Sequence, residues 1–398
     1  MTTLGISRKF FLVGALFALL AVVGIACGAS ATAVPAQPAA KAAPAQPAAP
    51  VAAPAAPVAA PALPQQVFKI KFTSPLAPPP FIFSELDKWW ADQVQARSGG
   101  RIVFTDFYWL GALTRAGEEL EAIEVGLAQA GSIQYPYYVG KLPLGNWNYP
   151  VPFGPGPEVV MKASQRLFDE IPALRAELER YNQKIIFLNV IDTYNLTSKK
   201  PIVNLEDFKG LKIASIGAYH PKILKDAGAT ATAMPVGERY EALSSGIVEA
   251  EFLPWDISYA YKFHEINKHA TFVDMGSNKP VVLTVNRDFW NRLPPDLQDL
   301  MLQVGKEAMQ LNIDIITKKR EEALAAWKAA GVTIHTMPEA ERAKWAALLP
   351  DYPKLWIDDM DSKGLPGKRI MTTYLDILEE LGWKPVKPWA AEYRTKKK

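Results

Sequence analysis

From residue 67 onward, short apolar runs alternate with segments whose apolar residues recur at helical spacing. The stretches "VFKIKFTSP", "RIVFTDFYW" and "KIIFLNVID" predict strands, and "FSELDKWWADQVQARSGG" predicts an amphipathic helix that ends at two glycines. "TRAGEELEAIEVGLAQAG" predicts a further helix, followed by the short strand end "SIQY". This alternation predicts an α/β fold in which parallel strands are joined by crossover helices.

The same alternation continues through residues 210–255. "GLKIASI", "ATAMP" and "IVEAEFLPW" predict strands, and "HPKILKDAGA" and "GERYEALSSG" predict helices. Gly217 ends the first of these strands, and Pro221 stands where the next helix begins. In an α/β protein such a strand end faces the ligand cleft, but Ala214, Ser215 and Ile216 carry no charge. A charged group that binds a ligand at this strand end would therefore have to come from another segment of the chain.

Residues 294–331 change to one long helical pattern, with Leu297, Leu300, Met301 and Val304 at helical spacing. A helix of more than about 30 residues is roughly 50 Å long, which exceeds one small domain. We therefore expect it to cross two domains, with further helices after it packed on the outside.

The N-terminal region is built differently from the rest. Residues 1–26 combine Arg8 and Lys9 with an apolar run, as in an export signal, and Cys27 follows directly. This layout resembles a bacterial lipoprotein signal, in which the cysteine becomes the lipidated first residue; the alternatives are a plain secretory signal and an uncleaved anchor helix. Residues 27–66 then read as the anchor cysteine and a semi-rigid tether rich in alanine and proline. All three interpretations place the remainder outside the cytoplasmic membrane, in the periplasm or at the cell surface.

Composition narrows the class of protein. The chain has 398 residues, 49% of them hydrophobic and 21% charged, which suits two soluble domains. Its formal charge of +3 falls to about +1 without the signal, which gives no reason to expect a nucleic-acid partner. Cys27 is the only cysteine, so no intrachain disulfide is possible.

The residues also argue against an enzyme. The chain has no Gly-x-Ser-x-Gly elbow and no phosphate-binding loop. We interpret the glutamates of residues 118–121 as a solvated helix face, and we expect no metal and no cofactor. The four histidines lack metal-binding spacing and are interpreted as ordinary surface or capping residues: His220, His264, His269 and His335.

Five segments, in order and at similar spacings, resemble the extracytoplasmic solute receptors of TRAP transporters: "ARSGGRIVFTDFYWLGAL", "EELEAIEVGLAQAG", "LEDFKGLKI", "YEALSSGIVEAE" and "VNRDFWNRLPPDLQDLM". The resemblance implies a two-domain periplasmic-binding-protein clamshell, closed by a ligand between the domains and spanned by the long helix. It places domain I at residues 67–191 plus 280–319 and domain II at residues 192–279 plus 320–398. It also implies delivery of a small molecule to an integral-membrane TRAP permease, without any reaction.

The strand "GLKIASI" departs from that family. Most of these receptors have an arginine where this chain has Ala214, and the arginine forms a two-pronged salt bridge with the ligand carboxylate. Alanine supplies no such bond. Four cations are open alternatives as substitutes: Lys199, Lys279, Arg115 and Arg239. For the last of these, the local pattern favours a solvated helix face and a pair with a nearby glutamate.

The loops predicted to face the cleft are aromatic, at residues 107–109, 134–138 and 146–153. We therefore expect a bulkier, less acidic or aromatic solute, a carboxylate or an aromatic compound, held by stacking and by polar groups such as Asn195 and Ser215. A metal ion held by Glu251 with Asp256 is a further alternative. The residues predicted to line the site are Pro75, Phe81, Trp109, Tyr135, Tyr137, Tyr194, Asn195, Ala214, Ser215, Glu251, Phe252, Trp255 and Lys279.

Two other functions compete with this interpretation. A similar clamshell receptor serves ATP-driven transporters or sensor kinases, and the neighbouring genes would distinguish it. An exported enzyme that reuses the fold is the second, and turnover of a tightly bound ligand would reveal it.

Overall fold

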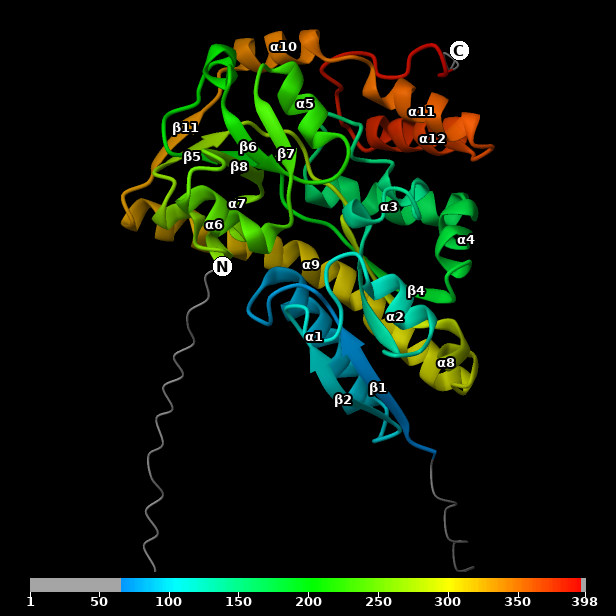
Figure 1. Ribbon diagram of the computed structural model, residues 1–398. Helices are drawn as coiled ribbons and strands as arrows, with labels where there is room; N and C mark the ends of the chain where they lie inside the picture. The colour runs from blue at the N-terminus through cyan, green and yellow to red at the C-terminus, as the bar shows by residue number, and fades with distance from the viewer. Residues whose placement is uncertain (1–65, 395–398) are drawn as a thin grey trace, which may run out of the picture. The chain divides into compact units, whose positions relative to one another are not determined.

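The computed structural model describes residues 66–394 and places their strands in two mixed sheets (Figure 1). Cys27, the export signal and most of the tether lie outside the described residues. The first sheet has the order β2-β1-β3-β10-β4 and the second the order β11-β9-β5-β8-β6-β7. The strands of the first sheet are β1 (Phe68–Thr73), β2 (Ile102–Tyr108), β3 (Ala130–Gln134), β4 (Gln183–Asn189) and β10 (Val281–Asn286). Those of the second are β5 (Asn195–Ser198), β6 (Lys212–Ser215), β7 (Thr230–Ala233), β8 (Ala250–Leu253), β9 (His269–Phe272) and β11 (Thr333–Thr336).

The helices fall into three groups. Those between strands of the first sheet are α1 (Ile82–Arg97), α2 (Glu119–Glu124), α3 (Pro157–Glu170), α4 (Ala173–Glu179) and, after β10, α8 (Arg287–Asn291). Those of the second sheet are α5 (His220–Asp226), α6 (Arg239–Ser244) and α7 (Trp255–Ala260). The C-terminal group comprises α9 (Pro295–Ala329), α10 (Glu339–Leu348), α11 (Tyr352–Ser362) and α12 (Gly367–Glu380). None of the helices within residues 66–394 combines the length and the apolar character needed to cross a membrane.

The expectation of parallel strands is only partly correct. β1 pairs in parallel with β2 and β3, and β6 with β7 and β8. However, β10 runs antiparallel to β3 and β4, and β5 runs antiparallel to β8 and β9. These two strands belong to the segments that carry the chain from one sheet to the other, so no crossover helix precedes them and no parallel direction is imposed.

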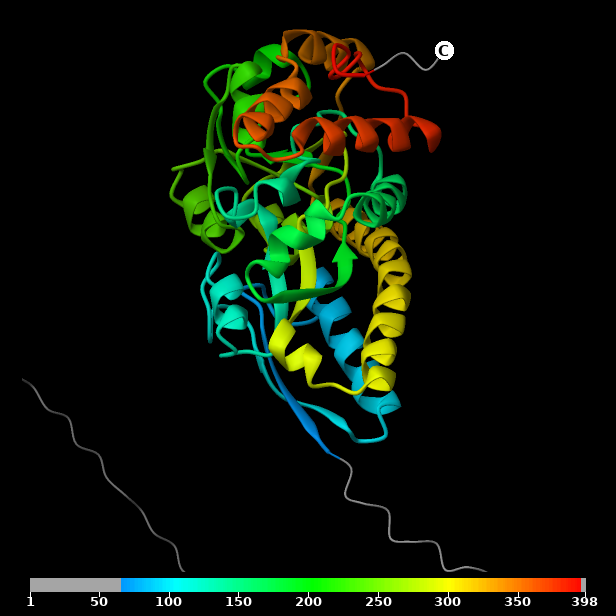
Figure 2. The same cartoon turned by 90° about the vertical axis from the view of Figure 1, so that its right-hand side faces the viewer.

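The long helix predicted for residues 294–331 is confirmed as α9, a single helix of 35 residues (Figure 2). It packs on α1 and β4 of the first sheet and on α7 of the second, so it contacts elements of both. Gly305 allows the close approach to β4, since a Cβ there would lie 3.0 Å from the carbonyl oxygen of Ile186. The domain boundaries derived from the resemblance stay a prediction.

Two local predictions are wrong. The helix expected over residues 114–131 is reduced to α2, because Gly117 and Gly126, with φ of 92° and 75°, turn the chain on both sides. The glutamates of residues 118–121 are not all solvated either. Glu119 is buried and accepts a 2.6 Å hydrogen bond from the hydroxyl of Tyr138.

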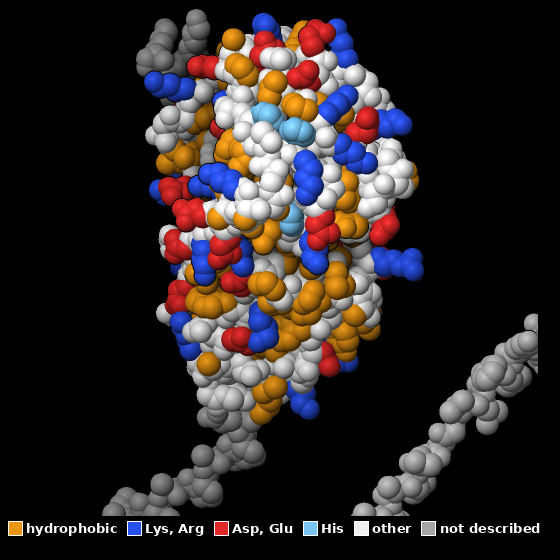
Figure 3. Space-filling model, turned by 90° about the vertical axis from the view of Figure 1, so that its left-hand side faces the viewer, with side chains coloured by type: hydrophobic (Ala, Val, Ile, Leu, Met, Phe, Trp, Pro, Cys, Tyr) orange, Lys and Arg blue, Asp and Glu red, His pale blue; other side chains and the backbone are white. Residues whose placement is uncertain are grey.

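On the face in Figure 3, basic and acidic side chains are interspersed over the surface. No field of one sign dominates this view, in keeping with the small net charge of the chain.

A buried carboxyl in the first sheet gives a pH-dependent prediction. Asp87 on α1 accepts a 2.6 Å hydrogen bond from Ser132 on β3, and its other oxygen has no partner. Burial raises the pKa of Asp87 to about 7 in the folded protein, against 3.8 for an ordinary aspartate. Because the folded state holds this proton more tightly than the unfolded state, Asp87 lowers stability as the pH rises from about 4 to about 7.

Asp87→Asn removes this titration and keeps the shape of the side chain. We expect the variant to gain about 2–4 kcal/mol of unfolding free energy relative to the parent on going from about pH 4.5 to about pH 8. Urea unfolding of both proteins at the two pH values measures the change. An equal difference between the proteins at both pH values would contradict the assignment.

Candidate functional site

A cation from helix α6 lies at the end of β6. Arg239 lies in the first turn of α6, and its Nη2 donates to the carbonyl oxygens of Ser215 at 2.6 Å and Met234 at 3.0 Å. Its Nε also donates to Met234, at 3.2 Å. The guanidinium is thus fixed beside the strand end at which Ala214 leaves no charge.

The prediction that Arg239 lies on a solvated helix face is wrong, since this residue is 0% exposed. It shares one face of α6 with Ala242 and Leu243, three and four residues later, and both of these are buried. That spacing was visible in the sequence and would have placed Arg239 on the inner face.

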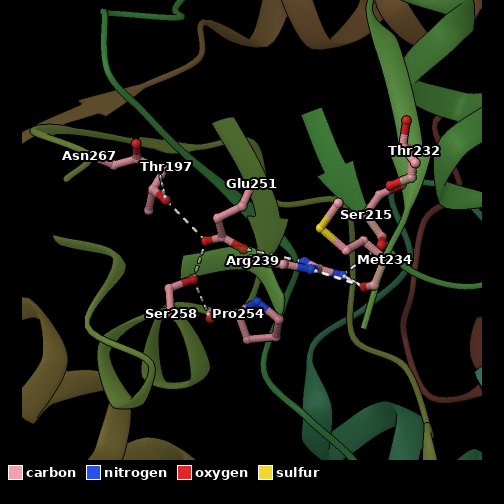
Figure 4. Close-up of polar contacts among 9 residues, drawn as sticks. All are labelled: Thr197, Ser215, Thr232, Met234, Arg239, Glu251, Pro254, Ser258 and Asn267. Atoms are coloured by element: carbon pink, nitrogen blue, oxygen red, sulfur yellow. Dashed lines mark hydrogen bonds and ion pairs between the residues drawn. The ribbon is translucent and has the colours of Figure 1, made fainter. Parts of the chain in front are cut away.

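Glu251 on β8 is the acidic partner of this arginine (Figure 4). Nη1 of Arg239 lies 3.6 Å from Oε2 of Glu251, with both side chains 0% exposed. Oε1 of Glu251 accepts hydrogen bonds from the hydroxyls of Thr197, at 3.0 Å, and Ser258. Nη1 and Oε2 themselves have no hydrogen-bond partner. Charges are attracted at this separation, but one donor and one acceptor are still available for a third group.

Three tyrosines lie within electrostatic range of the guanidinium. Tyr137, Tyr194 and Tyr261 all interact electrostatically with Arg239. Tyr194 stacks on Phe252, with ring centroids 5.5 Å apart and planes at 27°, and lies edge-on to His220 with centroids 4.2 Å apart. We call Arg239, Glu251, His220, Phe252 and these three tyrosines the Arg239 cluster.

The Arg239 cluster lies where segments of the two sheets meet. Tyr137 comes from the 3-10 turn η1 (Tyr135–Tyr137) directly after β3, whereas Arg239 and Glu251 belong to the second sheet. Tyr149, which follows η2 (Leu144–Asn146), contacts His220 with ring centroids 5.2 Å apart. A ligand held here would therefore contact residues associated with the first sheet and residues of the second sheet, as closure around a ligand requires.

Further contacts join the two halves near the cluster. A Cβ on Gly217, just after β6, would lie 3.7 Å from Pro136 and 3.9 Å from the ring of Tyr149. Phe81 before α1 packs edge-on against Tyr261, with ring centroids 5.6 Å apart.

Burial sets the protonation of the cluster. It raises the pKa of Glu251 to about 7, although Arg239 and the two hydroxyls oppose the shift. It lowers the pKa of His220 to about 3, with a further contribution from Arg239, so this imidazole is neutral. Burial also raises the pKa of Tyr137 to about 12 and that of Tyr194 further, so both keep their hydroxyl protons. Burial lowers the pKa of Arg239 as well, but a guanidinium remains charged.

The structure brings about half of the residues predicted to line the site together. Phe81 packs on Tyr261, Ala214 and Ser215 form the strand end beside the guanidinium, and the others belong to the Arg239 cluster. These residues are Phe81, Tyr137, Tyr194, Ala214, Ser215, Glu251 and Phe252. The polar group that Ser215 offers is its carbonyl oxygen, because its hydroxyl donates to the carbonyl of Thr232 at 3.4 Å.

Lys279 and Tyr135 lie together in a different place. The Nζ of Lys279 is 3.4 Å from the ring centroid of Tyr135 and 4.5 Å from that of Trp147. Burial lowers the pKa of Lys279 well below its usual value, and the attraction of Glu177 opposes the shift. Neither residue is among the groups that act on Arg239.

The other two candidate cations lie in other surroundings. Nζ of Lys199 donates to the carbonyl of Leu243 at 2.6 Å, at the C-terminal end of α6. Arg115 is exposed. Of the four candidates, Arg239 is the one that the structure places beside the end of β6.

Four further predicted residues have other surroundings. Oδ1 of Asn195 accepts hydrogen bonds from the backbone amides of Val273 and Asp274, at 3.0 and 2.9 Å. This side-chain oxygen therefore fixes the backbone after β9. Trp255 packs on Phe272 and Trp327 in a second apolar cluster. Trp109 stacks on Phe107 of β2, and Pro75 is half-buried after β1.

Glu251 and Asp256 do not share one site. Asp256 is influenced by Asp192 and Arg320, whereas Glu251 is influenced by Arg239, Ser258 and Thr197. Within residues 66–394 there is no group of three or more histidine, cysteine, aspartate or glutamate side chains arranged to hold a metal ion.

Three cluster or neighbouring residues were not predicted from sequence: Tyr149, His220 and Tyr261. The interpretation of His220 as a surface or capping residue is wrong, since it is 2% exposed and packed among aromatic rings. Tyr149 lies in a loop whose aromatic character was recognised, so that composition was the available signal. For Tyr261, which reaches the cluster after α7, the local pattern offered none.

A groove of about 1140 Å³ lies elsewhere, between α3, β4 and α9. It contains none of the residues predicted to bind ligand.

Comparison with known proteins supports one class of function. The model of the family "Bacterial extracellular solute-binding protein, family 7" matches residues 76–359. A solute-binding protein of Albidiferax ferrireducens is 25% identical over 64% of this chain and 75% of its own length. The C4-dicarboxylate-binding periplasmic protein of Rhodobacter capsulatus is 31% identical over 39% of this chain, and the chain spans about half of that protein (46%).

Solved structures agree on the fold. A TRAP solute-binding protein from Rhodoferax ferrireducens, crystallised with copurified benzoate, superimposes with a TM-score of 0.72 at 23% identity. The match covers 79% of this chain and 98% of that chain.

Proposed function

Since this chain belongs to family 7 of the bacterial extracellular solute-binding proteins, we propose that the Arg239 cluster binds its solute and that the solute is an aromatic carboxylate. The chain is an extracytoplasmic solute receptor of the TRAP type. We further propose that it has no catalytic activity, that it hands its solute to a TRAP permease, and that Cys27, outside the described residues, carries a lipid anchor.

The Nη1 of buried Arg239, which makes no hydrogen bond, carries this proposal. A buried cationic donor without a hydrogen bond is costly, and a ligand carboxylate supplies the missing acceptor. Its position beside Ala214 puts the cation at the strand end where most receptors of this type carry theirs.

The aromatic side chains of the cluster suit an aromatic solute. Phe252 and the three tyrosines provide ring faces and edges, and offset or edge-on contacts with a ligand ring are favourable. The tyrosine hydroxyls keep their protons and can donate to polar substituents. The relative crystallised with benzoate makes an aromatic monocarboxylate the appropriate first probe.

Calorimetry of the purified protein with four matched compounds tests the ligand class. We expect benzoate and 3-hydroxybenzoate to bind at about micromolar affinity. Cyclohexanecarboxylate lacks the ring faces and should bind at least about tenfold more weakly, whereas benzyl alcohol lacks the carboxylate and should not bind detectably. Binding of succinate as tight as that of benzoate would contradict the proposal, because the cluster offers one cation and not two.

A further inference from the structure

Arg239 and Glu251 form a pair without net charge. Both side chains are 0% exposed, and their charged atoms lie 3.6 Å apart. The groups next to them are uncharged, since His220 is neutral and the tyrosines keep their protons. Above the pKa of Glu251, the cluster therefore holds one positive and one negative charge before any ligand enters.

An anionic ligand upsets this balance. With a carboxylate on Nη1, one guanidinium faces two carboxylates in a volume closed to water. The unbalanced negative charge is unfavourable there, because burial penalises a charge that lacks its own partner. Neutralising Glu251 by a proton removes the excess and leaves Arg239 to the ligand.

The hydrogen bonds around Glu251 suit both protonation states. The hydroxyl of Ser258 lies within hydrogen-bonding distance of Oε1 of Glu251 and is also 3.1 Å from the carbonyl oxygen of Pro254 (Figure 4). It donates to Glu251 when the carboxylate is charged. When its own proton turns toward Pro254, the Ser258 oxygen can accept a hydrogen bond from a neutral Glu251 without movement of heavy atoms.

Thr197 completes this arrangement. Its Oγ1 accepts from Nδ2 of Asn267 at 3.0 Å, so its own proton remains directed to Glu251. One hydroxyl therefore stays a donor to the carboxyl, while the other can exchange roles. If Glu251 served only as a fixed partner of Arg239, Ser258 would not need the Pro254 carbonyl as a second acceptor.

We propose that Glu251 takes up a proton from solution when an anionic ligand binds Arg239, so that the receptor captures a carboxylate together with one proton. This inference rests on the proposed function, because it takes the ligand to be a carboxylate at the Arg239 cluster.

The electrostatics of the described residues agree with this assignment. Burial raises the pKa of Glu251 to about 7. The charge of Arg239 opposes this rise, and so do the hydrogen bonds from the hydroxyls of Ser258 and Thr197. A ligand that shares Arg239 weakens that opposition, so the pKa rises further in the complex. The other titratable groups near the pair are His220, Tyr137, Tyr194 and Tyr261, and all act on or respond to Arg239. Asp256 on α7 responds to Asp192 and Arg320 instead.

Calorimetry of benzoate binding in buffers of different ionisation enthalpy measures the proton uptake directly. At about pH 8 we expect the parent protein to take up close to one proton per ligand. Its affinity should fall about tenfold per pH unit above the pKa of Glu251 in the ligand-free protein. Glu251→Gln, which is uncharged at every pH, should bind benzoate without proton uptake and with a nearly constant affinity. Glu241→Gln, an exposed glutamate of α6, is the matched control and should behave as the parent.

The outcomes separate the two claims. If benzoate binds the parent at about pH 8 without proton uptake, the proton linkage is wrong and the ligand class stands. If neither benzoate, 3-hydroxybenzoate nor mandelate binds at about pH 5.5 or at about pH 8, both claims are wrong. The measurements on the parent decide the matter even if Glu251→Gln fails to fold.

Discussion

Replacing Arg239 by methionine is expected to lower the affinity for benzoate by about a hundredfold or more. A charge-assisted hydrogen bond to a buried carboxylate contributes about 1.5–3 kcal/mol, and the guanidinium also balances the charge of the ligand. Methionine keeps a long unbranched side chain, so the shape of the cluster changes little. Titration calorimetry of the variant with benzoate measures the loss.

The same substitution leaves Glu251 buried without its cation. We therefore expect Arg239→Met to lose stability mainly above about pH 7, because an unpaired buried carboxylate has to bind a proton. The double variant Arg239→Met with Glu251→Gln should recover most of this stability without recovering benzoate binding. That pattern distinguishes a lost ligand contact from a misfolded site.

Arg115→Met is the matched control, since it removes an exposed arginine that was also a candidate on sequence grounds. It should leave both affinity and melting temperature close to those of the parent. If Arg115→Met lowers benzoate affinity as much as Arg239→Met does, the cation of the site has been misassigned.

Local patterns predicted much of the fold. β1, β2, β6 and α9 were found because each depends on a period of apolar residues within its own segment. β5, β9 and β11 were not found, since their pairing partners lie far along the chain. The antiparallel direction of β10 likewise depends on where the chain re-enters the first sheet, which no local period records.

The site residues likewise fall into those that local sequence features indicate and those that depend on contacts between distant segments. Tyr137 was predicted because aromatic loops are visible in composition, and the missing charge at Ala214 was visible by comparison within the family. The replacement cation was not identified, because Arg239 is recognised by its contacts with Ser215 and Glu251, from two different strands. The helical spacing of Arg239 from Ala242 and Leu243 pointed inward, but burial of an arginine is rare enough to favour the opposite interpretation.

Replacing Gly276 by alanine is expected to destabilise the protein by about 2–4 kcal/mol, because strain and overlap add. Gly276 has φ of 106°, and a Cβ there would lie 2.6 Å from the backbone nitrogen of Gly154. Gly154 donates from its amide to the carbonyl of Met275 at 3.0 Å, and Tyr194 donates to the carbonyl of Gly276 at 3.0 Å. Added volume at this position therefore separates the loop of Gly154 from the segment that orients Tyr194 in the Arg239 cluster.

Gly382→Ala isolates the two contributions. Gly382 has φ of 94°, similar to that of Gly276, but a Cβ there would meet nothing within 4 Å. Its substitution should cost about 1 kcal/mol of unfolding free energy from backbone strain alone, with benzoate affinity unchanged. Gly276→Ala should cost more in urea unfolding and should also weaken benzoate binding, because the position of Tyr194 depends on it. Equal losses of stability in the two variants would mean that the backbone at Gly154 yields without cost, and the coupling between this segment and the Arg239 cluster would then be wrong.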